Sequence, residues 1–163
     1  NPSQRGLQSV KIRIVAPGHL KDRWLKDGIE EYRKRLSRFC RLEVIEVEDC
    51  PDSMPREECL RREGERILSH IRDNDIVWVM DLHGELVTSE ILSDYLISDL
   101  TRGGGNLTIA IGGSNGIASD VTARASRRIC FGNITLTHLM TRLILTEQLY
   151  RGFKIAGKEK YHK

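Results

Sequence analysis

The C-terminal residues Tyr161, His162 and Lys163 have side chains suited to chemistry on a nucleic acid. Histidine titrates near neutral pH and can move a proton, and a tyrosine ring can stack on an unpaired base or hydrogen-bond to it. The segment from Arg151 to Lys163 holds five basic residues against one acidic residue, a net charge of +4 that suits contacts to phosphates. The competing interpretation is a frayed chain end, because most termini are poorly ordered.

Asp81 and His83 form a second candidate pair, with a carboxylate and an imidazole two positions apart. Two groups are too few for a metal site, so we expect a solvated turn here and no bound metal. The cysteines form no C-x-x-C pair, which predicts neither a zinc site nor a disulfide framework. They are interpreted as reduced structural thiols of a cytoplasmic protein, at positions Cys40, Cys50, Cys59 and Cys130.

Three glycines, Gly112, Gly113 and Gly116, follow an apolar run in the stretch "IAIGGSNGIASD". Glycine permits positive φ angles and lets a ligand approach the backbone closely. A Walker loop is disfavoured because Ile117 stands where that motif needs lysine, and a dinucleotide fingerprint is disfavoured because the pattern is G-G-x-x-G after a fourth strand. The motif therefore indicates either a ligand held by main-chain groups or an ordinary tight turn.

Apolar periodicity predicts strands that alternate with helices, which is typical of a parallel α/β sheet with helices on both faces. We expect one domain over residues 10–163, while residues 1–9 lack periodicity and are interpreted as a disordered extension or an expression remnant. The predicted strands cover residues 10–16, 41–48, 75–81, 106–112 and 127–132. The predicted helices cover residues 22–39, 88–100 and 136–153, a segment after Pro55 and a short segment from Ser119. Thr88 is the predicted N-cap of the helix over residues 88–100.

Three glycine-containing segments, 79–85, 111–116 and 130–138, follow predicted strands. The carboxyl ends of parallel strands meet at one edge of a sheet, where open α/β folds bind ligands. We expect either a flat, mostly apolar ligand at this edge or three ordinary connecting turns.

Charge and hydropathy set wider limits on the function. The chain has 163 residues, 39% of them apolar, and a net charge of +3. Residues 21–41 carry eight bases against four acids, whereas residues 43–65 carry nine acids against three bases. No apolar run approaches the length of a membrane span. The long last helix is apolar on more than one face, which predicts two packing surfaces, one on its own sheet and one on a partner.

The combination of "IGGSNG", "FGNITLTHLMTRLILTEQLYRGFKI" and the terminal "YHK" closely resembles the RlmH family. The resemblance runs from Val10 to Lys163 and includes the E-G-x-R-I-L match at residues 63–68. These are SPOUT-class enzymes that use S-adenosylmethionine to methylate the ring nitrogen at position 3 of a pseudouridine in large-subunit ribosomal RNA.

The resemblance implies a trefoil-knotted α/β fold, a homodimer, and a substrate presented within the ribosome. The cofactor-binding positions it implies are Met80, Gly112, Phe131, Gly132, Asn133, Ile134, Thr135 and Leu136. With the tail chemistry above, it makes Tyr161 and His162 the catalytic candidates. The candidate RNA contacts are Arg142, Arg151, Lys154, Lys158 and Lys163.

The sequence departs from the family pattern at two places. Thr137 stands where relatives commonly have proline, and Gly157-Lys158 stands where Arg-Gly is expected, which affects the path of the tail and leaves the cofactor loops untouched. Two alternatives remain open: a non-catalytic RNA-binding or ribosome-binding protein that retains the fold, and an unrelated nucleotide-binding α/β protein.

Overall fold

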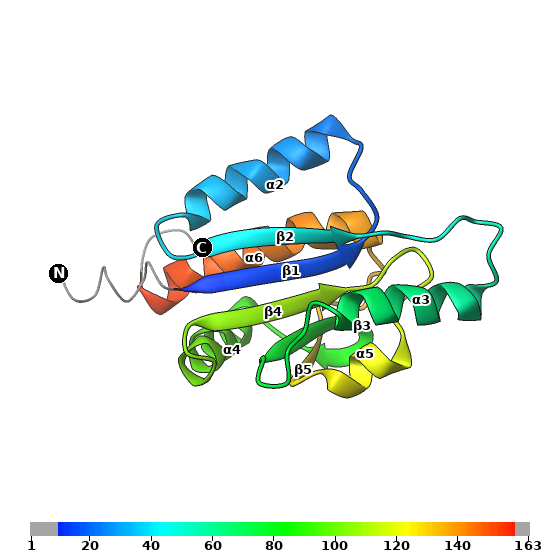
Figure 1. Cartoon of the computed structure of the whole chain (residues 1–163). Helices are drawn as coiled ribbons and strands as arrows, with labels where there is room; N and C mark the ends of the chain where they lie inside the picture. The colour runs from blue at the N-terminus through cyan, green and yellow to red at the C-terminus, as the bar shows by residue number, and fades with distance from the viewer. Residues whose placement is uncertain (1–9, 159–163) are drawn as a thin grey trace.

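The structure is a computed structural model that describes residues 10–158, and its central feature is a five-stranded parallel sheet of order β2-β1-β4-β3-β5 (Figure 1). The strands are β1 Lys11–Pro17, β2 Arg41–Val47, β3 Val77–Leu86, β4 Asn106–Ile111 and β5 Arg127–Cys130. The helices are α2 Arg23–Leu36, α3 Arg56–Leu68, α4 Ser89–Arg102, α5 Ser119–Arg124 and α6 His138–Ala156. The predicted alternation of strands and helices is confirmed.

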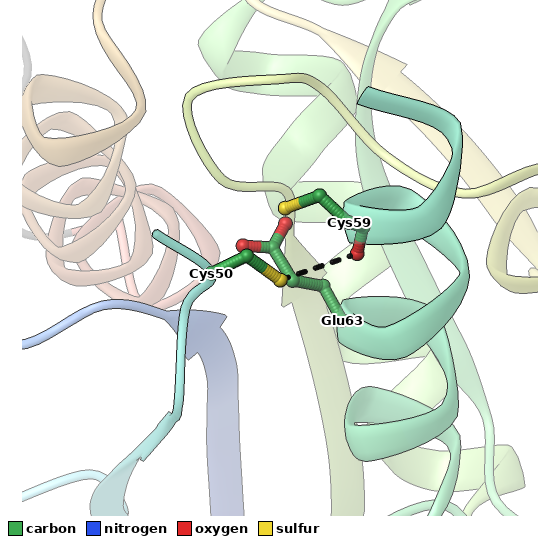
Figure 2. A group of neighbouring side chains, drawn as sticks. All are labelled: Cys50, Cys59 and Glu63. Carbon is green, nitrogen blue, oxygen red and sulfur yellow. Dashed lines mark hydrogen bonds between the residues drawn. The ribbon is translucent and has the colours of Figure 1, made fainter. Parts of the chain in front are cut away.

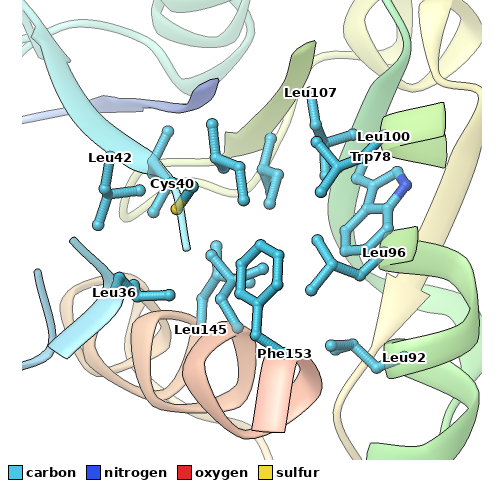
Figure 3. Close-up of a cluster of buried hydrophobic side chains, with 14 of the residues drawn as sticks. Leu36, Cys40, Leu42, Trp78, Leu92, Leu96, Leu100, Leu107, Leu145 and Phe153 are labelled. Atoms are coloured by element: carbon cyan, nitrogen blue, oxygen red, sulfur yellow. The ribbon is translucent and has the colours of Figure 1, made fainter. Parts of the chain in front are cut away.

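Helices cover both faces of the sheet, as predicted. Ile12 and Ile14 of β1 pack with α4 and α6 on one face, in the cluster of Leu92, Leu96, Trp78, Leu145 and Phe153 drawn in Figure 3. Val15 of β1 points to the other face and packs with Ile67 of α3 and Val121 of α5. This alternation is the period of two that a strand imposes on its side chains. Burial of two apolar faces is therefore what holds three layers together.

Threonine side chains begin two of the long helices. Thr88 caps α4, where its hydroxyl accepts a hydrogen bond from the Ile91 N–H at 3.1 Å, as the sequence predicts. Thr137 caps α6 in the same way and accepts from the Met140 N–H at 3.1 Å. Such caps contribute about 1 kcal/mol to a helix. The departure from proline at position 137 thus replaces a rigid residue with a capping one.

The second apolar surface of α6 is covered within the same chain, which corrects part of the sequence interpretation. Leu139, Met140 and Leu143 pack against Leu25 and Ile29 of α2. Figure 1 shows α6 running behind the sheet, with α2 above it and α4 below. The apolar pattern of α6 therefore arises from neighbours on both sides in one chain, and it is not by itself evidence for a partner.

At the amino edge of the sheet, where the strands begin, a buried carboxylate is fully paired. Asp99 of α4 is inaccessible to solvent and accepts hydrogen bonds from Trp78 Nε1 at 2.7 Å and Arg127 Nε at 2.6 Å. Arg102 reaches it from the solvent side at 3.2 Å. Although burial opposes ionisation, the hydrogen bonds from Arg127 and Trp78 hold the pKa of Asp99 below its ordinary value. Asp99 therefore remains charged and links α4, β3 and β5.

Candidate functional site

At the carboxyl edge of the sheet, where the strands end, the three predicted segments surround one cavity of about 1010 Å³. It lies beyond the ends of β3, β4 and β5 and is closed by the start of α6. This volume is at the upper end of what small-molecule sites usually occupy. The expectation that the three strand exits converge is confirmed.

The glycine loop after β4 closes on itself. Gly113 and Gly116 exchange backbone hydrogen bonds of 3.1 and 3.0 Å, and Gly116 has a φ of +96°. A Cβ on Gly112 would lie 2.3 Å from the Gly116 carbonyl oxygen, and one on Gly113 would lie 2.9 Å from a carboxylate oxygen of Glu63. Only Gly116 uses the positive φ that glycine permits. The other two glycines are required because the chain passes its own backbone and Glu63 too closely for a side chain.

Seven of the eight implied cofactor positions line the cavity. Met80 lies in β3, between Ile111 of β4 and Ile129 of β5 in the strand register. The segment 131–136 forms the wall between β5 and α6, and its Ile134 is 81% exposed. Asn133 is exposed and is absent from the cavity wall. The lining positions are Met80, Gly112, Phe131, Gly132, Ile134, Thr135 and Leu136.

Strand β3 contains an excursion that the sequence does not predict. Met80 and Glu85 both pair with Ile129, so residues 81–84 leave the ladder and extend over the cavity. A Cβ on Gly84 would lie 2.7 Å from the backbone of Arg128, which explains the glycine where the strand rejoins β5. The excursion places exposed Leu82 at the cavity rim.

The sequence predicts a solvated turn at Asp81 and His83, but both residues lie within β3, and the Asp81 carboxylate is ion-paired with Arg128 and only 8% exposed. Asp81 accepts a hydrogen bond from the His83 backbone N–H at 3.0 Å and another from Arg128 Nε at 2.7 Å. Burial raises the pKa of Asp81, but these two hydrogen bonds and the Arg128 charge outweigh it and hold the pKa below its ordinary value. The imidazole of His83 is exposed and lines the cavity.

Arg142 does not lie on an RNA-facing surface, and that expectation is wrong for this chain. Its side chain is 1% exposed and donates to the Glu46 carboxylate at 2.6 Å and to the carbonyls of Pro17 and Gly18 at 2.8 Å each. It therefore ties α6 to the ends of β1 and β2. One turn earlier, His138 lines the cavity, and burial together with the Arg142 charge lowers its pKa.

The other basic candidates follow the second half of α6. Arg151 pairs with Glu147 at 2.6 Å, and the Lys154 ammonium lies 5.8 Å from the centre of the Tyr150 ring. Gly157 ends the helix, and exposed Lys158 has a φ of +55°. The departure of Gly157 and Lys158 from the family pattern thus lies at the end of α6. The remaining tail candidates Tyr161, His162 and Lys163 lie outside the described residues.

Two cavity residues are missed by sequence reasoning. Trp24, at the start of α2, is 61% exposed at the cavity rim. Arg56 of α3 donates to the backbone carbonyl of Asn115 at 3.1 Å, which connects α3 to the glycine loop. These side chains come from segments far apart in the sequence and match no motif. Only the tertiary structure brings them to the site.

Comparison with known proteins identifies the family. The family model described as "Predicted SPOUT methyltransferase" matches residues 10–162. The chain belongs to this family. It is 43% identical over 159 residues to "Ribosomal RNA large subunit methyltransferase H 1" of Clostridium perfringens, and 44% identical over 160 residues to the enzyme named "Ribosomal RNA large subunit methyltransferase H" in Clostridium tetani. Each alignment covers 94% of this chain and 100% of the relative.

Among solved structures, a probable methylase family protein from Haemophilus influenzae aligns with a TM-score of 0.48 and 13% identity, covering 93% of this chain and 67% of that one. A methyltransferase of this family requires a methyl donor. Within residues 10–158, none of the helices is long and apolar enough to cross a membrane.

Proposed function

We propose that this protein is an S-adenosylmethionine-dependent methyltransferase that methylates the ring nitrogen at position 3 of a pseudouridine in large-subunit ribosomal RNA. The relatives named above support the substrate class, and family membership supports the reaction. The observation that carries the proposal is the single cavity enclosed by three strand exits at the carboxyl edge. The trefoil knot implied by the family belongs to the same proposal.

The cavity suits a ligand that is partly apolar and carries hydrogen-bonding groups. Ile111, Ile134 and Leu136 provide apolar surface, while the glycine loop and segment 131–136 offer main-chain groups without large side chains in the way. Adenosylmethionine combines a flat purine with a polar methionine end. We therefore assign the seven lining positions to the cofactor, together with Asn133 as an adjoining, exposed residue of the same segment.

The reaction makes few demands on side-chain chemistry. The methyl group of a sulfonium is already electrophilic, so the transfer is a direct displacement. The acceptor nitrogen lies between two carbonyls and must lose its proton. The protein must therefore align the nitrogen with the methyl group and provide a route for the proton. We propose His162 for the proton and Tyr161 for contact with the base.

The basic end of the chain is proposed to bind the RNA. Arg151, Lys154 and Lys158 follow one another along the end of α6 and just beyond it, and Lys163 ends the chain. Each lysine that contacts a phosphate adds to the salt dependence of binding. Lys154→Ala or Lys158→Ala should therefore weaken RNA binding and reduce its salt slope by about one phosphate each.

A homodimer is proposed as the functional unit, with the tail of one chain completing the site of the other. The support is the family and a group of exposed apolar side chains near the cavity, Trp24, Leu82 and Ile134. Exposed apolar side chains gathered in one region are typical of protein interfaces. Sedimentation that gives a monomer at micromolar concentration would exclude the dimer.

Removal of the tail tests the mechanism. A chain that ends at Lys160 should bind the cofactor with unchanged affinity but lose nearly all methylation of ribosomes from a strain that lacks this gene. His162→Ala should lose turnover and keep RNA affinity if the imidazole handles the proton. Wild-type methylation by the shortened chain would refute the tail mechanism. A full-length chain that binds RNA but not S-adenosylmethionine would indicate the non-catalytic alternative.

A further inference from the structure

Three side chains with metal-binding atoms meet beneath the glycine loop, outside the cavity wall. Cys59 and Glu63 lie four residues apart on α3 and thus on one helix face. Cys50 comes from the connection between β2 and α3, and Figure 2 shows its sulfur beside the other two side chains. The two sulfurs and a carboxylate oxygen all lie within 4.8 Å of one another.

One atom of this cluster lacks a hydrogen-bond partner. Glu63 is only 4% exposed, and its Oε1 atom is buried without a hydrogen bond. An unpartnered buried carboxylate oxygen costs free energy, so it marks a place where a missing partner would stabilise the fold. The glycine loop runs close above, since a Cβ on Gly113 would lie 2.9 Å from the same Glu63 oxygen. The two sulfurs lie within 4.8 Å of a carboxylate oxygen, so a partner bound between them would be shared by all three side chains.

We propose that Cys50, Cys59 and Glu63 bind one thiophilic divalent cation of the zinc class. Two thiolates select such a cation over magnesium or calcium, which prefer oxygen ligands. Zinc sites with three protein ligands keep a fourth position for water. The Asn115 side chain hydrogen-bonds to the Cys59 thiol.

The geometry requires a small closure. Two sulfurs bound tetrahedrally to zinc at about 2.3 Å lie roughly 3.8 Å apart. The two sulfurs lie within 4.8 Å of each other at present, so the closure is at most about 1 Å. Cys50 lies in a connection outside helices and strands and can make this movement, while Cys59 and Glu63 are held by α3. At present the Cys50 thiol donates to the Cys59 carbonyl oxygen at 3.6 Å, a weak contact that metal binding would replace.

Charge around the cluster is compatible with a bound cation. Two thiolates and a carboxylate exceed the charge of a divalent ion by one. Arg66 compensates, since its Nη1 atom lies 4.0 Å from the Cys50 sulfur and donates to the Glu48 carbonyl at 2.8 Å. The sequence does not predict this site, because Cys50 and Cys59 are separated by eight residues and match no zinc spacing. A bound ion would fix the connection before α3 to the helix beneath Gly113.

Cobalt substitution tests the site by spectroscopy, independently of any methylation. The full-length protein is reduced with a phosphine, freed of metal with a chelator, and titrated with Co²⁺. We expect one equivalent to bind, with the charge-transfer absorption of cobalt–thiolate bonds and the strong visible bands of tetrahedral cobalt, and Zn²⁺ to displace it. Cys50→Ser and Cys59→Ser should each lower the affinity at least tenfold and reduce the thiolate absorption. Glu63→Gln should weaken binding but retain that absorption.

Cys130→Ala is the matched control, because Cys130 lies in β5 outside the cluster and should leave Co²⁺ binding unchanged. Thiol alkylation of the unaltered chain, read by mass spectrometry, covers the case in which a cysteine variant fails to fold. Zn²⁺ should slow alkylation of Cys50, the partly exposed member of the cluster. Absence of thiolate absorption, the same absorption in the Cys50/Cys59 double variant, or alkylation of Cys50 unaffected by Zn²⁺ would overturn the proposal.

Discussion

The two edges of the sheet differ in whether their buried polar side chains have all their hydrogen-bond partners. At the amino edge, Asp99 is fully paired, and Arg13 bonds to Asp75, to Thr108 and to the carbonyl of His70. At the carboxyl edge, two atoms, Oε1 of Glu63 and Nε of Arg142, are the buried side-chain polar atoms without a partner in the described part of the chain. Hydrogen bonding is therefore complete around Asp99 at the amino edge, whereas two buried atoms at the carboxyl edge lack a partner, outside the cavity wall.

Loss of the Asp99 carboxylate should produce the largest effect, and it should act on stability alone. Asp99→Asn leaves the partly buried Arg127 without its anion, and breaking such a pair costs about 3–5 kcal/mol. Urea unfolding measures the change, and S-adenosylmethionine affinity of the folded variant should match the wild type. Arg102→Ala is the control, since its exposed ion pair with the same carboxylate contributes at most about 1 kcal/mol.

The Asp99 contribution also has a defined pH dependence. Because the pKa of Asp99 is lower in the folded than in the unfolded chain, the stabilisation is fully present above the unfolded value of about 3.9. This stabilisation is lost as the pH falls further, through the lower pKa that Asp99 has in the folded chain. An unfolding free energy that shows no difference in acid sensitivity between wild type and Asp99→Asn would contradict this assignment.

Replacing a glycine of the loop after β4 by a residue with a side chain should produce the next largest effect. This effect should be on cofactor binding. Gly112→Val places a Cβ 2.3 Å from the Gly116 carbonyl oxygen, so the loop must open. We expect at least a tenfold loss of cofactor affinity, about 1.4 kcal/mol, in calorimetric titration. Ser114→Ala, an exposed position in the same loop, should bind normally. Unchanged affinity of the valine variant would remove the loop from the site.

The smallest effect concerns His138 at the cavity. Burial and the Arg142 charge lower its pKa, with Asp49 acting weakly in the opposite direction. The unfolded chain therefore binds more protons near pH 6, and stability falls as the pH drops through the unfolded value of about 6.5. His138→Gln should flatten this part of the stability profile between pH 7.5 and 5.5, about one unit on either side of that value. Parallel profiles for variant and wild type would show that His138 titrates as in the unfolded chain.

Local patterns in the sequence predict most of the fold. Alternation in residues 10–16, the Thr88 cap and the strand exits rest on rules that act over a few residues, and the structure confirms them. Two errors have a common origin. The sequence pattern indicates that the apolar faces of α6 and the charge of Arg142 need partners. It cannot say whether the partner is another molecule or lies in the same chain. In this structure α6 packs against α2, and Arg142 pairs with Glu46.

The sequence pattern alone predicts where the candidate site lies, at the three strand exits, but its individual cofactor positions come from the family resemblance. Met80, Gly112 and segment 131–136 carry no motif that names a cofactor, and the resemblance selects them. Trp24, Arg56 and the cluster of Cys50, Cys59 and Glu63 depend on contacts across long sequence separations, so no local pattern reveals them. The roles of Tyr161 and His162 stay predictions, because these residues lie outside the described part of the chain.

The excursion of β3 has an evolutionary consequence. The strand leaves the ladder after Met80 and resumes at Glu85 against the same residue, Ile129. Asp81 pairs with Arg128, and Gly84 passes the Arg128 backbone too closely for a side chain. Leu82 and His83 are exposed between them, so substitutions at these two positions should leave the core packing of β3 unchanged. Related proteins can therefore alter the rim of the cavity at this point without changing the paired part of the strand.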